Sequence, residues 1–107
     1  MSTASTPFQD VLLRNLKDPA EAEAYLDVAF AEFQEDGDMA FFLQALRNVA
    51  EAQGGISALA DKTHLNRQNL YKALSEKGNP RLETVGTILR GMGLRLRVEA
   101  LSEGEGV

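Results

Sequence analysis

Residues 55–74 read GISALADKTHLNRQNLYKAL, and this stretch predicts two short helices joined by a tight turn. The first helix offers Ala60, which is small enough for the second helix to cross it closely. The turn requires a residue that tolerates a positive φ angle, a place that glycine usually takes and that His64 takes here. Leu70 and Leu74, four residues apart, turn one face of the second helix toward the core. The stretch therefore has the pattern of a helix-turn-helix.

This helix-turn-helix, predicted over residues 57–75, exposes a polar face suited to reading DNA. Arginine pairs with guanine, and asparagine or glutamine with adenine, through two hydrogen bonds in the major groove. Recognition helices enter the groove by their N-terminal end, so the residues of the first turn are the leading base readers. The expected base contacts are Asn66, Arg67, Gln68, Tyr71 and Lys72. The expected backbone contacts, at helix starts and in the following loop, are Ser57, Asn69, Lys77, Asn79 and Arg81.

The charge of the chain changes sign along its length. The whole protein is acidic, with a formal net charge of −5 and a pI near 4.8, which by itself argues against nucleic acid. Residues 56–97, however, carry eight Lys or Arg against three acids, whereas residues 1–55 carry three against ten. The local field governs the encounter with DNA, and positive charge is gathered at the motif. The acidic first half is either a docking face for a basic partner or an ordinary solvated surface.

Capping signals and hydrophobic periodicity predict the rest of the fold. Asp18-Pro19 is a helix start, and Asp36-Gly37-Asp38 ends that helix and begins the next. Asn79-Pro80 is expected to cap and open a last helix. Residues 94–99, LRLRVE, alternate apolar and charged side chains, which is typical of a β-strand. The expected fold class is all-α: a five-helix, repressor-like helix-turn-helix domain with one short C-terminal strand.

The expected organisation has three parts. Residues 1–17 form a flexible N-terminal arm with a short apolar patch of one or two helical turns, residues 18–93 the helical domain, and residues 94–107 the strand and an acidic tail. A lone strand is not stable, so we expect it to pair with that of a second copy; the alternative is an extended tail. Such a homodimer presents two recognition helices to half-sites about one DNA turn, ~34 Å, apart. The expected dimer-strand residues are Leu94, Leu96 and Val98.

The composition argues against several other classes of protein. The chain has no cysteine and one histidine, and its carboxylates are scattered, so we expect neither a catalytic site, nor a metal site, nor a cofactor. No apolar run approaches the ~18–20 residues of a membrane span. The first residues lack the basic start and apolar stretch of a secretory signal, and the absence of cysteine fits a reducing compartment. We therefore expect a cytoplasmic protein that does not associate with membranes.

Several motifs between about Leu12 and Val98 also carry a resemblance to a known family. They are DP with EA and YL at residues 18–26, ALRNVA at 45–50, LNR and NLYKALS within 65–75, KGNPR at 77–81, and GLRL at 93–96. In these motifs the chain resembles the antidote (antitoxin) proteins of bacterial addiction modules, which carry a phage-repressor-type (Xre-like) helix-turn-helix and are HigA-like in organisation. His64 departs from the pattern, because glycine is common there.

The resemblance implies a dimeric DNA-binding protein that represses its own operon and neutralises a small basic ribonuclease-type toxin. By position it makes Asn66, Arg67, Gln68, Tyr71 and Lys72 operator-facing. Two alternatives stay open. The first is a free-standing transcriptional regulator without a toxin, and the second is a protein-binding adaptor whose helix-turn-helix is purely structural.

Overall fold

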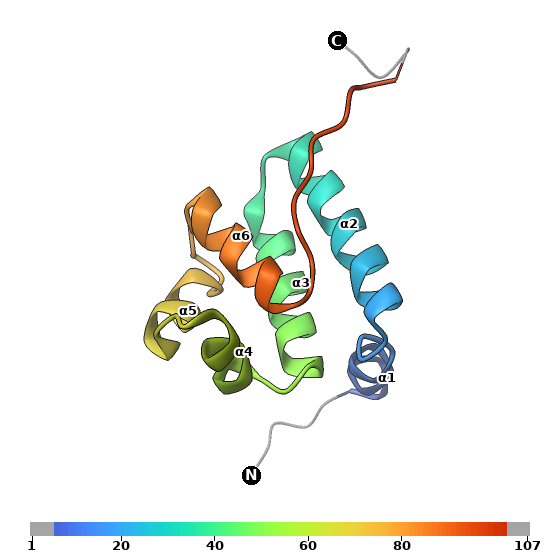
Figure 1. Ribbon diagram of the computed structural model, residues 1–107. Helices are drawn as coiled ribbons and strands as arrows, with labels where there is room; N and C mark the ends of the chain where they lie inside the picture. Colours follow the sequence, from blue (N-terminus) through green and yellow to red (C-terminus); the bar gives the residue numbers. More distant parts are fainter. Residues whose placement is uncertain (1–5, 103–107) are drawn as a thin grey trace.

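The computed structural model describes residues 6–102, which are all-helical apart from turns and an extended C-terminal segment (Figure 1). The helices in chain order are α1 (Pro7–Asn15), α2 (Pro19–Asp36), α3 (Met39–Ala52), α4 (Ile56–Thr63), α5 (Arg67–Ala73) and α6 (Leu82–Gly91). Helix α3 lies in the middle and contacts α1, α2 and α4, while α4 also contacts α5 and α6. The all-α prediction is confirmed.

The α2–α3 hairpin forms where its capping residues predicted it. The Asp18 carboxylate accepts a hydrogen bond from the N–H of Ala20 at 3.0 Å, with proline at the first helical position. Gly37 ends α2 in the left-handed conformation, with φ of 73°. The Asp38 carboxylate then accepts from the N–H of Ala40 at 2.9 Å and opens α3. Each of these caps satisfies backbone groups that a helix end leaves without a partner.

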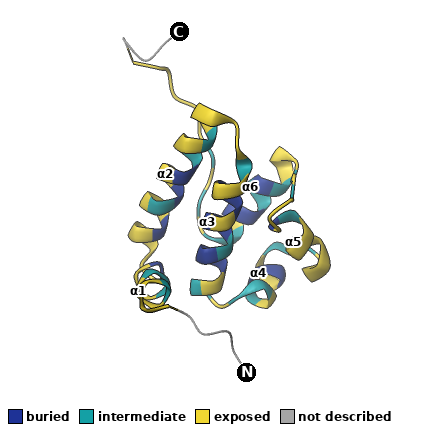
Figure 2. Ribbon diagram, turned by 180° about the vertical axis from the view of Figure 1, so that it is seen from behind, coloured by how far each residue is buried: buried dark blue, intermediate teal, exposed yellow. Residues whose placement is uncertain are grey.

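The core is built around α3, which carries many of the buried residues coloured dark blue in Figure 2. Phe42, Leu43, Leu46 and Val49 of this helix are almost wholly buried. Phe42 also contacts two partly buried rings of α2: it stacks with Phe33 and lies tilted against Phe30. The remaining helices contribute further buried apolar residues, namely Leu16, Leu26, Leu59, Leu70, Leu74, Val85, Ile88 and Leu89. Burial of these side chains is the main favourable term in folding.

One buried polar side chain joins the first three helices. Asn48 of α3 is 7% exposed, and its carbonyl oxygen accepts hydrogen bonds from the amides of Gln9 (3.3 Å) and Gln44 (3.2 Å). Its own amide donates to the hydroxyl of Tyr25 at 2.9 Å. Every partner matters here, because a buried amide left without hydrogen bonds is costly. The network therefore fixes α1 and α2 against α3.

The structure corrects three details of the predicted fold. Six helices are described instead of five, because residues 7–15 form a full helix that begins with the Thr6 side chain accepting from the N–H of Gln9. The last helix starts at Leu82 with Arg81 as its N-cap, since its first helical hydrogen bond joins the N–H of Val85 to the Arg81 carbonyl. Residues 6–102 contain no strand, because the extended C-terminal segment has no second strand to pair with.

Part of the expected organisation falls outside the described range. Residues 1–5 of the expected N-terminal arm and residues 103–107 of the expected acidic tail are not described. Residues 94–99, where the strand was expected, run in an extended conformation beside α2 (Figure 1).

Gly78, in the loop between α5 and α6, packs against backbone at a distance that no side chain allows. A Cβ there would lie 2.2 Å from the carbonyl oxygen of Ala73, so we expect Gly78→Ala to cost about 1–3 kcal/mol through overpacking. In a domain of this size that lowers Tm by roughly 4 °C or more. Thermal unfolding followed by circular dichroism measures the change.

Gly86→Ala is the matched control, because Gly86 lies inside α6 and a methyl group added there would meet no neighbouring atom within 4 Å. Alanine is a better helix former than glycine at this position. This variant should therefore keep the free energy of unfolding or raise it by up to about 1 kcal/mol, and its Tm should not fall. A Gly78→Ala variant as stable as Gly86→Ala contradicts the close packing of the loop.

Candidate nucleic-acid interface

Helices α4 and α5 occupy the positions predicted for the two helices of the motif, and they contact each other. His64 ends α4 in the left-handed conformation, with φ of 61°, and its N–H bonds to the Ala60 carbonyl at 2.8 Å. The prediction that His64 takes the positive-φ place of the turn is therefore confirmed. The Thr63 hydroxyl steadies the turn by accepting a hydrogen bond from the N–H of Leu65 at 3.2 Å.

The core holds α5 from one side. Leu70 and Leu74 are each 1% exposed, as their four-residue spacing predicted. Arg47 of α3 adds a polar contact, because its guanidinium donates a hydrogen bond to the backbone carbonyl of Leu74, one of the carbonyls that the end of a helix leaves unpaired. With this face held against the core, the other side chains of α5 must point outward.

All five residues predicted to contact bases are exposed, but two of them have partners within the chain. The carbonyl oxygen of the Asn66 side chain caps α5, accepting from the N–H of Gln68 at 2.7 Å and of Asn69 at 3.3 Å. The Asn66 amide nitrogen remains as a donor. The side chains of Gln68, Tyr71 and Lys72 make no hydrogen bond within residues 6–102.

Arg67 joins the two helices of the motif. Its guanidinium donates a hydrogen bond at 3.0 Å to the hydroxyl of Ser57, in the first turn of α4. A predicted base contact thus lies directly against a predicted backbone contact. Arg67 and Ser57 line an open hollow of about 790 Å³ between the two helices. Asp61 is the acidic residue of this hollow.

A second hollow gathers most of the predicted phosphate contacts. It has a volume of about 680 Å³, lies between α5 and the start of α6, and is lined by Asn69, Lys72, Lys77, Asn79 and Arg81 among others. All five are exposed. Arg81 lies 4.0 Å from Glu83, but both side chains are at least 80% exposed, so this ion pair holds Arg81 only weakly. Cations in such positions remain available for phosphate oxygens.

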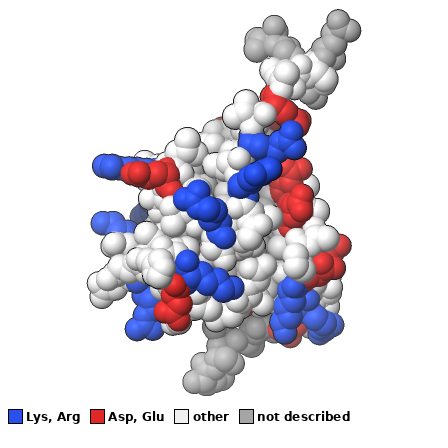
Figure 3. Space-filling model, in the orientation of Figure 1, with Lys and Arg blue, Asp and Glu red and all other residues white. Residues whose placement is uncertain are grey.

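Figure 3 shows acidic side chains over α2, and basic side chains spread over the same view, including beside α2. Helix α2 carries six carboxylates and no Lys or Arg. Its outer face combines three of these acids with a 60%-exposed valine; this face consists of Glu21, Ala24, Val28, Glu32 and Glu35, all exposed. The ion pair of Arg81 and Glu83 is the one present within residues 6–102, so the acids of α2 are not neutralised inside the described chain.

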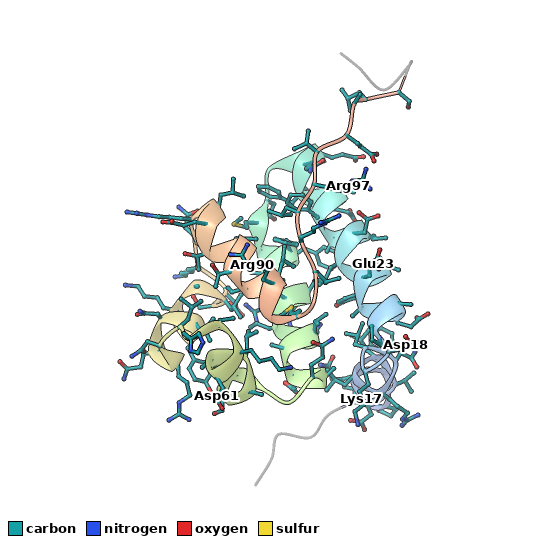
Figure 4. The ribbon with its side chains drawn as sticks, in the orientation of Figure 1. Lys17, Asp18, Glu23, Asp61, Arg90 and Arg97 are labelled. Carbon is teal, nitrogen blue, oxygen red and sulfur yellow. The ribbon has the colours of Figure 1, made fainter. Side chains whose placement is uncertain are left out.

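The three residues predicted for a dimer strand lie away from α5. Leu94 and Leu96 pack partly buried against the core, and Val98 is 96% exposed. A groove of about 590 Å³ separates this segment from α2 (Figure 4). It is bordered on one side by residues 94–97 and on the other by Glu23 and Asp27 of α2.

Sequence reasoning missed the anchoring role of Arg47. A single basic residue within the apolar α3 helix was the available signal, since a charged group in such a place requires a partner. Two negative results concern the described part of the chain. It holds no cluster of three metal-ligating side chains, and none of its helices combines the length and apolar character of a membrane span.

Comparison with known proteins places the chain in a family. A family model described as "Probable addiction module antidote protein" matches residues 11–100, which run from α1 to the extended C-terminal segment. The chain is also 31% identical, over 85 residues, to an uncharacterized protein of Haemophilus influenzae, an alignment that covers 79% of this chain and 82% of that protein. No solved structure matches significantly. The chain therefore belongs to the family of addiction-module antidote proteins.

Proposed function

We propose that this antidote protein represses transcription by binding operator DNA as a homodimer, and that it neutralises a small basic ribonuclease-type toxin. The antidote family supports an antitoxin role and a toxin partner in general, and it is generally non-enzymatic. The observation that carries the DNA proposal is the outward polar face of α5, which the buried Leu70 and Leu74 hold away from the core. Its residue types are those that read base edges.

The reading step begins with Arg67. In the free protein its guanidinium is held by the Ser57 hydroxyl, at the N-terminal end of α5 that enters the major groove. This contact keeps the side chain beside the groove-facing surface, and exchanging a single hydrogen bond to a hydroxyl for a bidentate pair with guanine favours the bound state. The freed Ser57 hydroxyl then donates to a phosphate oxygen. Gln68 and Lys72 extend the contacts along the same helix.

The backbone contacts come from the second hollow. Lys77 and Arg81 place two cations around it, and each phosphate neutralised releases condensed counterions. This term is independent of sequence and sensitive to salt. It offsets the unfavourable net charge of the whole molecule, because residues 56–97 carry only three of the sixteen acids against eight Lys or Arg.

The toxin is proposed to dock on the outer face of α2. Three unneutralised carboxylates around an exposed valine offer a basic partner both opposite charge and apolar contact. Electrostatic complementarity of this kind speeds association and selects the partner. The face lies on α2, whereas the proposed DNA surface lies on α4, α5 and the start of α6, so both partners can be held together.

Arg67→Ala tests the reading of bases. We expect this variant to lose about 5- to 150-fold in affinity for a duplex from upstream of its own gene, because one bidentate base contact is removed. Its affinity for a random duplex of equal length should change much less. Electrophoretic mobility shifts at two salt concentrations measure both.

Two controls accompany this measurement. Arg14→Ala removes an exposed arginine from α1 and should leave both affinities unchanged. Lys77→Ala should weaken binding to both duplexes alike and reduce the slope of log affinity against log salt by about one. If Arg67→Ala behaves like Lys77→Ala, α5 does not read bases through Arg67.

Glu32→Lys/Glu35→Lys tests the toxin surface. Both residues lie on the outer face of α2 and away from the groove beside the C-terminal segment. We expect the double variant to lose affinity for a basic toxin encoded beside its gene by tenfold or more, since two attractive contacts become repulsive. Co-expression, copurification and calorimetry measure the loss.

The matched control, Asp10→Lys/Glu51→Lys, makes the same charge change at exposed positions on α1 and α3. It should keep most of the toxin affinity. Equal loss in both double variants means that net charge, and not the outer face of α2, attracts the toxin. DNA binding without any copurifying partner favours the free-standing regulator instead.

A further inference from the structure

The extended segment after α6, residues 94–101, is hydrogen-bonded to the rest of the described chain only at its first residue. Gly93 turns the chain with φ of 81°, and the N–H of Leu94 bonds to the Leu89 carbonyl at 2.8 Å. From there the chain runs back beside α2, with Arg97 on its exposed side (Figure 4). Leu94 and Leu96 pack partly buried against the core. Even-numbered side chains of the segment therefore face the core side.

The segment leaves its own polar groups unpaired. Residues 95–101 make no hydrogen bond within the described range, and Arg95, Arg97 and Glu99 form no ion pair there. Val98 is 96% exposed although its even number puts it on the apolar side. An extended backbone with open hydrogen-bonding groups and an exposed β-branched residue is a template for pairing with another strand.

A second copy of the chain is the occupant that fits. Two copies can pair antiparallel about a two-fold axis that is perpendicular to the two-stranded ribbon they form. The core sides of both segments then face the same way. Even-numbered residues must therefore lie opposite even-numbered ones, and odd-numbered residues opposite odd-numbered ones. Each possible register is then defined by its centre, which is the residue that lies opposite the same residue of the second copy. Opposite charges directly across strands stabilise pairing, and like charges destabilise it.

These charges select one register between residues 95 and 99. Centres at Arg95, Arg97 or Glu99 put a charged residue against its own copy. A centre at Leu96 puts Arg95 against the partner's Arg97 twice. A centre at Val98 puts Arg97 against the partner's Glu99 twice and covers Val98 with its own copy.

We propose that the chain dimerises by antiparallel pairing of residues 95–101 with the same residues of a second copy, in the register centred on Val98. The proposal rests on the proposed homodimer and specifies how it forms. Pairing joins Leu96, Val98 and Ala100 of both copies into one apolar strip on the core side of the ribbon. The charges of this segment form no ion pair within the described chain. In the dimer they select the register of pairing.

Single cysteines test the register directly, because the natural chain has none. Residues that face each other across an antiparallel pair lie about 4.5–5.5 Å apart between Cα atoms, within the range of a disulfide. We expect Val98→Cys to form a covalent dimer under mild oxidation, seen on a non-reducing gel. Leu96→Cys and Arg97→Cys, at the centres of rejected registers, should crosslink at least tenfold less.

Charge exchange is the second measurement. Arg97→Glu or Glu99→Arg alone should raise the dimer dissociation constant about tenfold or more, and the double variant should restore it. Sedimentation equilibrium of the purified chain measures this constant. Preferred crosslinking at residue 96 or 97, no crosslink at any of the three, or failure of the double variant to recover overturns the proposal.

Neither measurement depends on DNA or toxin. A chain that crosslinks through Val98→Cys but does not bind the upstream duplex keeps this pairing and loses the proposed repressor function. A chain that binds the duplex but fails both measurements keeps the repressor function and loses this pairing.

Discussion

The seating of α5 on the core is the constraint on which the rest of the surface depends. Leu70 and Leu74 are buried almost completely, and Arg47 of the central helix holds the carbonyl of Leu74. A seven-residue helix is too short to be stable by itself, so its position and rotation come from these contacts. Because of these contacts, the polar residues of α5 point into solvent. The proposed DNA-reading face is thus a consequence of how the opposite face is packed.

Few charges are neutralised inside the described chain. Its one ion pair, Arg81 with Glu83, lies at the surface, while the acids of α2 and the arginines of the C-terminal segment face solvent. Charges that do not stabilise the fold are free to select partners. Three surfaces of different character follow: cationic and amide-rich at α5, acidic on α2, and self-complementary after α6. We assign DNA to the first surface, a basic toxin to the second and a second copy of the chain to the third.

The sequence predicted what depends on short-range signals. The caps at Asp18, Asp38 and Asn66 and the left-handed His64 were all confirmed, because each is decided within a few residues. The helix after Thr6 was missed, although its cap and proline repeat the pattern of Asp18-Pro19. A lone arginine in the apolar α3 helix indicates that a partner exists but not that it is Leu74, and the contact of Arg67 with Ser57 leaves no local pattern at all. A strand at residues 94–99 cannot form in one chain, because its ladder requires a partner.

The outward side of α5 is the surface that we propose meets DNA. Titrating the isotopically labelled protein with the duplex from upstream of its gene, followed by backbone amide NMR shifts, tests this claim most directly. We expect the largest shifts at Ser57, at residues 66–72 and at residues 77–81, and none in α2. Shifts centred on α2, or no shifts at saturating duplex and low salt, would contradict it.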